Sequence, residues 1–173
     1  MGQTASVVTI GLKKISIAPI ASDGGPGTVF VDFGNVSTDS FNFAEEEPTT
    51  KTVSIEESSS PLKEFKTKGK LVVNCNIADA DTDMFALLRG GAVTTASGVK
   101  TYKEGDAVAN AERTVKIEPA EGLTFVMNRA ALSGQLTGGL GKNQELFLAV
   151  SITALKPNKS GVETITVIET IAA

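Results

Sequence analysis

The sequence predicts a single, mainly β domain: a β-sandwich or barrel with one short helix, an N-terminal arm and one extended loop. Two observations predict the strands. Apolar residues recur at every second position in residues 71–77 and 145–155, and Val, Ile and Thr dominate residues 163–171. Because side chains alternate between the two faces of a strand, a period of two indicates a strand with one buried face. A chain of 173 residues is most simply one domain.

Gly-, Pro- and Asn-rich stretches separate the predicted strands, as turns do. In chain order, the strands are expected at residues 13–20, 28–33, 36–43, 53–56, 71–77, 93–102, 114–118, 123–127, 132–137, 145–155 and 163–171. Two other segments are too polar to build a core and too long for simple turns. They are the N-terminal arm, residues 1–10, and an extended charged loop, residues 44–70.

One segment, at about residues 80–89, predicts a helix. Asp79 and Asp81 supply an N-cap, and Asp83 adds negative charge near the positive end of the helix dipole. Met84, Leu87 and Leu88 recur at helical spacing, with Phe85 beside them. The pair Gly90-Gly91 ends the helix.

The composition excludes several kinds of chemistry. The chain has no histidine, so Ser-His-Asp catalysis, Cys-His catalysis and His-ligated metals are excluded. Cys75 is the only cysteine, which excludes an internal disulfide and a cysteine-based zinc site. The net charge of −4 disfavours tight binding of nucleic acid. Neither a membrane-spanning run nor a signal peptide is evident, so we expect the chain to be made and kept in a cytoplasm.

Motifs that resemble catalytic or metal sites all break at important positions. Asp79-x-Asp81-x-Asp83 resembles the start of a calcium loop, but Met84 replaces its glycine and Gly90 its bidentate glutamate, so helix capping is favoured. A glycine-rich run ending in Lys142 lacks the Ser or Thr of a phosphate loop and predicts a hairpin turn. Paired carboxylates remain, as Glu118 with Glu121 or Glu104 with Asp106, without a supporting motif. We therefore expect no catalytic residue, no metal site and no cofactor.

The charges are distributed in two neighbouring blocks of opposite sign. Residues 44–57 carry five glutamates against Lys51, and residues 62–70 carry four lysines against Glu64. A solvated loop is the commoner interpretation of such runs. The alternative is an acidic and a basic surface that meet between copies of the chain. The candidate contact residues are Glu45, Glu46, Glu47, Lys63, Lys66 and Lys68.

The outward phases of three predicted strands carry small polar side chains and no Lys or Arg. They include Asn74, Asn76, Ser133, Gln135 and Thr137, and then Ser151 and Thr153. A solvent-exposed sheet face is the ordinary interpretation. However, solvent-exposed strands usually carry some lysine, above all at sheet edges. The lack of basic residues therefore argues against an ordinary solvent-exposed face.

The order of these features resembles a bacteriophage tail tube, or major tail, protein of the long-tailed kind. The resemblance covers most of the chain and rests on the order and type of the predicted elements rather than on an invariant motif. It lies in the strand GKLVVNCNIAD, the helix DADTDMFALLRGG and the C-terminal hairpin LSGQLTGGLGKNQELFLAVSITALKP. The family is similar in fold to the inner tubes of contractile tails and of type VI secretion.

The resemblance implies a structural subunit without catalysis, which assembles with itself into hexameric rings. Stacked rings would form a hollow tube through which DNA passes without specific binding. The implied partners are other tail proteins, such as the tape measure and the tail terminator, and the implied location is the virion tail, with the host cytoplasm before assembly. Residues 1–10 and 44–70 would bridge neighbouring subunits, and Asn74, Asn76, Ser133, Gln135 and Thr137 would face the lumen.

Two alternatives from other classes stay open. One is a monomeric β-sandwich module that binds carbohydrate or peptide in a groove. The other is an enzyme that uses the paired carboxylates.

Overall fold

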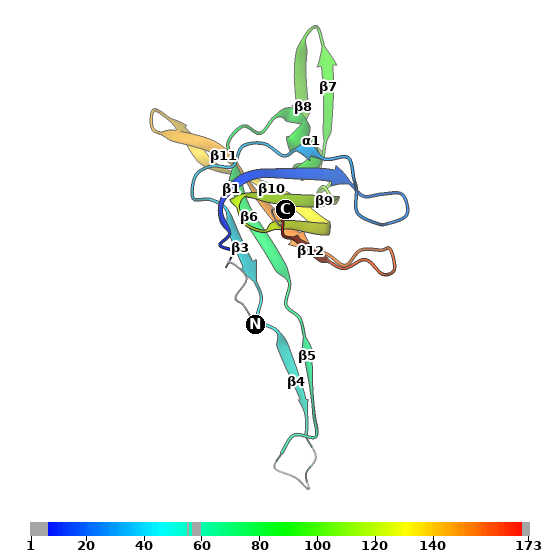
Figure 1. Ribbon diagram of the computed structural model, residues 1–173. Coiled ribbons are helices and arrows are strands. Elements are labelled where there is room, and N and C mark those ends of the chain that lie inside the picture. The colour runs from blue at the N-terminus through cyan, green and yellow to red at the C-terminus, as the bar shows by residue number, and fades with distance from the viewer. Residues whose placement is uncertain (1–6, 55, 57–59, 171–173) are drawn as a thin grey trace.

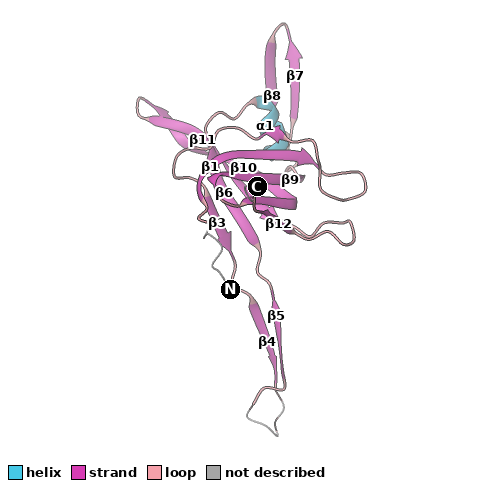
Figure 2. Cartoon of the chain, in the orientation of Figure 1, coloured by secondary structure: helices cyan, strands magenta, loops and turns pink. Residues whose placement is uncertain are grey.

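The computed structural model describes residues 7–54, 56 and 60–170. The protein is mainly β with one short helix, consistent with a β-sandwich, and this confirms the predicted fold class (Figure 1, Figure 2). The strands are β1 (Ile10–Pro19), β2 (Val31–Asp32), β3 (Asn42–Glu45), β4 (Thr49–Val53), β5 (Lys63–Thr67), β6 (Leu71–Ile77), β7 (Ala92–Ala96), β8 (Val99–Lys103), β9 (Ala111–Glu121), β10 (Thr124–Gly141), β11 (Gln144–Ala154) and β12 (Ile165–Ile168). The helix is α1 (Thr82–Arg89).

The main sheet is antiparallel throughout and has the strand order β2-β1-β9-β10-β11-β6-β3, with β12 paired to β10. The 18-residue strand β10 has different partners along its length. Its first residues, Thr124–Met127, lie between β9 and β12, and its later residues pair with β11. The register against β9 shifts between Met127 and Ala130, where a bulge bends the strand. One long strand thereby connects β9 and β12 to β11, β6 and β3.

The core is one continuous hydrophobic cluster. It takes alternate residues from β1, β6, β9, β10 and β11, as the predicted period of two requires. The strand residues of this core are Ile15, Ile17, Val73, Cys75, Ile77, Ala111, Val115, Ile117, Met127, Ala130, Leu132, Leu148, Val150 and Ile152. Phe33, from the segment after β2, completes the core and donates its backbone N–H to the carbonyl of Ile15.

Helix α1 begins and ends as the sequence predicts. The side chain of Asp81 accepts a 2.8 Å hydrogen bond from the backbone N–H of Met84, and Gly90 ends the helix with a positive φ. Leu88 is buried against β10 at Gly134, where an added Cβ would lie 2.9 Å from the Cβ of Leu88. A glycine at position 134 is therefore what lets the helix approach the sheet.

The structure corrects several predicted strands. Residues 28–33 contribute only the two-residue β2, and residues 36–43 contribute an isolated bridge between Val36 and Ile77, followed by β3. The strand expected at 53–56 lies at 49–53, because β4 pairs with β5 in a hairpin within the expected loop 44–70. The segments 123–127 and 132–137 are parts of the single strand β10. Residues 93–102, expected as one strand, form the β7–β8 hairpin.

Candidate functional site

The predicted polar residues on β6, β10 and β11 share one face of the main sheet. Cross-strand pairing aligns Asn74 with Ser151, and Ser151 with Ser133. The next row aligns Asn76 with Ala149, and Ala149 with Gln135. Because directly opposed residues in an antiparallel sheet point to the same side, these rows form a continuous surface. We call it the polar face.

The rows of the polar face that pair across β6, β10 and β11 carry no charged side chain; Glu145, at the start of β11, is a carboxylate in the same phase beyond these rows. The members of these rows are Val72, Asn74, Asn76, Ala131, Ser133, Gln135, Thr137, Phe147, Ala149, Ser151 and Thr153. Ser133, Gln135 and Thr137 are exposed, whereas Asn76 is half-buried.

An arginine that the sequence analysis missed lies at one end of this face. Arg129 donates two hydrogen bonds of 2.8 Å to the carboxylate of Glu112, and further ones to the carbonyl of Lys156 and the side chain of Asn158. Glu112 is level with Ala131 of the polar face. A bidentate pair of this kind satisfies the guanidinium locally. No local sequence signal reveals the pair, because the two residues meet only through the register of β9 and β10.

The charged segment 44–70 forms a hairpin that projects from the sheet (Figure 1). Glu45 ends β3, and the backbone N–H of Glu46 donates to the carbonyl of Lys70 at its base. Glu45 and Lys68 of the same chain approach to 3.9 Å, with both side chains mostly exposed. Part of the two opposed charge blocks therefore meets within one copy, although such an exposed pair contributes only about 0–1 kcal/mol.

The other candidate lysines lie on different faces of this hairpin. Lys63 is paired with Val53, and its ammonium lies 4.8 Å from the ring centroid of Phe65. Lys66 is paired with Thr50 and directly follows Phe65 in β5. Because side chains alternate along a strand, Lys66 points to the side of the hairpin opposite to Phe65 and Lys63. Residues 1–6 of the predicted N-terminal arm lie outside the described residues, and Ile10 already belongs to β1.

The β7–β8 hairpin is a second projecting element. It extends from the end of the molecule opposite to β4–β5 (Figure 1). Ser97 and Gly98 form its turn, both with positive φ. The Ser-Gly dipeptide was the available signal for this turn. Lys100 pairs with Asp83 of α1, which raises the pKa of Lys100 through their hydrogen bond. The hydroxyl of Tyr102 donates to the carbonyl of Gly90.

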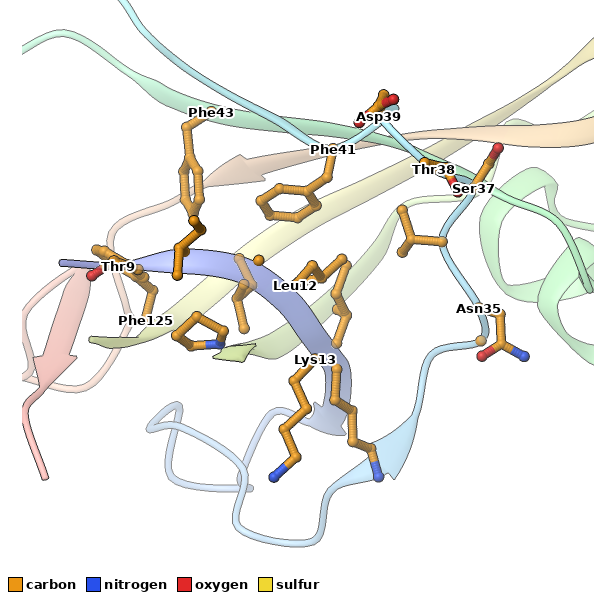
Figure 3. Close-up of a pocket in the computed structure, with 18 of the residues that line it drawn as sticks. Thr9, Leu12, Lys13, Asn35, Ser37, Thr38, Asp39, Phe41, Phe43 and Phe125 are labelled. Carbon is orange, nitrogen blue, oxygen red and sulfur yellow. The ribbon is translucent and has the colours of Figure 1, made fainter. Parts of the chain in front are cut away.

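An open groove of about 840 Å³ lies between β1 and the segment around β3 (Figure 3). Leu12, Phe41, Phe43 and Phe125 line its apolar part, as Figure 3 shows. The rings of Phe41 and Phe43 meet nearly edge to face, with centroids 5.2 Å apart, and Phe43 and Phe125 are 5.3 Å apart. The phenylalanines thus pack on one another rather than forming a flat platform for a sugar ring.

Each aspartate of the calcium-like triplet has a partner within the chain. Asp79 accepts hydrogen bonds from the backbone and side chain of Asn35, Asp81 caps α1, and Asp83 pairs with Lys100. This agrees with the helix-capping interpretation. The described residues contain no cluster of three or more potential metal-ligating His, Cys, Asp or Glu side chains.

The other motifs also have structural explanations. Lys142 lies in the turn between β10 and β11, as predicted. Glu118 pairs with Lys116, and Glu104 with Arg89. Burial raises the pKa of Cys75 to about 11. No helix among the described residues is long and apolar enough to cross a membrane.

Comparison with known proteins gives one finding that covers nearly the whole chain. A protein-family model described as "Phage tail tube protein" matches residues 12–170. No curated protein matches the chain. The matched region begins in β1 and extends beyond β12, so it contains the whole main sheet from Leu12 onward and both projecting hairpins.

Proposed function

Because the chain belongs to the phage tail tube protein family, we propose that its copies form rings that stack into a hollow conduit for DNA during genome delivery. Family membership makes the chain a structural subunit of the virion tail. Hexameric rings are the symmetry that the sequence resemblance implied. Before assembly, the subunit would be present in the host cytoplasm, and it would carry no catalytic site.

The observation that carries the conduit is the polar face. A surface on which DNA slides must not hold phosphate, because each Lys or Arg contact adds affinity and therefore friction. The polar face offers hydroxyl and amide groups and no cation along three adjacent strands. We assign Asn74, Asn76, Ser133, Gln135 and Thr137 to the lumen on this basis. The pair of Arg129 and Glu112 at its end supports the same assignment, because the cation is neutralised.

The opposed charge blocks at the β4–β5 hairpin supply candidate contacts between subunits. Glu46 and Glu47 at its base have no ion pair among the described residues, and the same holds for Lys66. Glu45, Glu46 and Glu47 of one copy would face a lysine of the group Lys63, Lys66 and Lys68 in another. Individual exposed pairs are weak, so the effect depends on repetition around a ring. The tape measure and tail terminator remain the expected partners of the tube's interior and end.

Two experiments test this function. Negative-stain imaging of the purified protein should show hollow tubes or rings; a protein that stays monomeric at high concentration would contradict the proposal. Replacing Glu45, Glu46 and Glu47 by Lys should block stacking, and adding Lys66→Glu and Lys68→Glu should restore part of it. Stacking that is indifferent to both sets of changes would refute the charge pairing and leave the tube itself intact.

A further inference from the structure

The β4–β5 hairpin has two chemically different faces. Pairing places Lys51 opposite Phe65 and Val53 opposite Lys63, and these four side chains share one side, which we call the Phe65 face. The opposite side, the Thr52 face, carries Thr50, Thr52, Glu64 and Lys66. Phe65 and Val53 are 48% and 38% exposed. The hairpin therefore presents apolar side chains on one face only, flanked by cations and by no carboxylate.

Among the described residues, β4 and β5 pair only with each other, so no other strand covers the Phe65 face. Backbone hydrogen bonds from Glu46 to Lys70 and from Leu62 to Val53 bracket the hairpin, so it reaches roughly 25 Å beyond the sheet at about 3.3 Å per residue. No residue of β4 or β5 belongs to the core. An isolated two-stranded hairpin is marginally stable in water, and an apolar face stabilises it only when that face is covered. Since the described core and main sheet leave this face uncovered, a second copy of the chain is the candidate cover.

The opposite end of the molecule has complementary chemistry. Between Asp79 and Asp106 the sequence holds five carboxylates against three cations. Val108, in the loop after β8, is 89% exposed, and Asp106 beside it has no ion pair among the described residues. Figure 1 shows α1 and β7–β8 at the end of the molecule away from β4–β5. We call this region, residues 79–108, the acidic end.

We propose that the Phe65 face of one copy docks on the acidic end of a second copy, around Asp106 and Val108. This inference rests on the proposed assembly and names the surfaces that stack. The cations Lys51 and Lys63 match the excess of carboxylates, and Phe65 and Val53 cover the exposed Val108. Because the two surfaces differ and lie at opposite ends, the contact is head to tail and repeats without closing, as stacking in a tube requires.

Substitution of one face at a time tests the contact. Phe65→Ser together with Val53→Ser should weaken stacking roughly tenfold or more, measured as the concentration needed to sediment tubes. The matched control, Thr50→Ser together with Thr52→Ser on the opposite face, should sediment like the wild type. Equal behaviour of the two variants would overturn the inference.

Cross-linking tests the pairing of surfaces directly. In a Cys75→Ala background, Phe65→Cys combined with Val108→Cys should give a ladder of disulfide-linked chains on oxidation, whereas Thr52→Cys with Val108→Cys should give little. Tubes without a ladder would reject this contact and leave the proposed function standing. Wild-type protein that forms no tubes would overturn both, because the contact requires the assembly.

Discussion

At the scale of single residues, a buried hydroxyl holds the loop after β1 to the sheet. Thr114 is fully buried, accepts a 2.7 Å hydrogen bond from the backbone N–H of Gly27, and donates to the carbonyl of Asn128 at 3.0 Å. Gly27 is close enough that an added Cβ would lie 2.0 Å from the carbonyl oxygen of Pro19. Any residue larger than glycine at position 27 would therefore clash with β1, and the Gly27 backbone can bond directly to the Thr114 hydroxyl.

Thr114→Val keeps the shape of the side chain and removes both hydrogen bonds. It should lower the free energy of unfolding by about 1–3 kcal/mol, because a buried N–H and a buried carbonyl lose their partner. Urea-induced unfolding measures this loss, with the exposed Thr101→Val as the control that should change stability by less than about 0.5 kcal/mol. Equal effects of the two substitutions would show that the Thr114 hydroxyl contributes nothing.

Cys75 should be unreactive in the folded protein. It is 2% exposed, and burial raises its pKa from 9.0 to about 11, so the thiolate is rare near neutral pH. A thiol-specific reagent at pH 8 should label the protein in urea and leave the native protein unlabelled. Since the folded-state pKa is the higher one, this thiol lowers stability as the pH rises from about 9 to 11. Rapid labelling of the native protein would contradict its place in the core.

At the scale of elements, the β4–β5 hairpin is separable from the body. Replacing residues 47–69 by an Asn-Gly turn joins Glu46 to Lys70, which already pair at 3.0 Å. The melting temperature of the body should stay nearly constant, because this segment supplies no core residue, while tubes should be lost. Sedimentation and thermal unfolding measure the two effects. Tubes of normal length from this variant would exclude the hairpin from assembly.

The elements also show what the sequence could predict. The helix and the strands β6 and β11 were predictable because their signals are local: a cap, a period and flanking glycines. The β7–β8 hairpin was missed because Val93–Tyr102 reads as one β-rich run, with Ser97-Gly98 as its only break. Residues 49–53 and 63–67 were assigned to a loop, because their alternation of Thr and Lys with few apolar residues lacks a buried face.

The candidate surfaces also divide into features with a local sequence signal and features that depend on strand pairing. The polar face was predictable, since alternation alone assigns side chains to one side of a strand. The pair of Arg129 and Glu112 was not, because it depends on the register of two strands. The separation of Lys63 from Lys66 onto opposite faces likewise required the pairing of β4 with β5.

At the scale of the whole molecule, the β4–β5 and β7–β8 hairpins project from opposite ends (Figure 1), and the main sheet carries the polar face. Gln135→Lys with Thr137→Lys should still assemble, because both side chains are exposed and outside the core. In a phage that carries them, genome release should slow and become more sensitive to salt, since new cations would hold phosphate. The control Lys13→Gln, at an exposed position of β1, should leave release unchanged; unaltered release by the lysine variant would argue against a lumen position.

The most direct test of the central claim is a cryo-electron microscopy reconstruction of tubes assembled from the purified protein. We predict that Ser133, Gln135 and Thr137 line the central channel, with β4–β5 reaching from one ring to the next. A reconstruction that places these three side chains on the outer wall would contradict the assignment of the polar face to the lumen, even if the protein forms tubes.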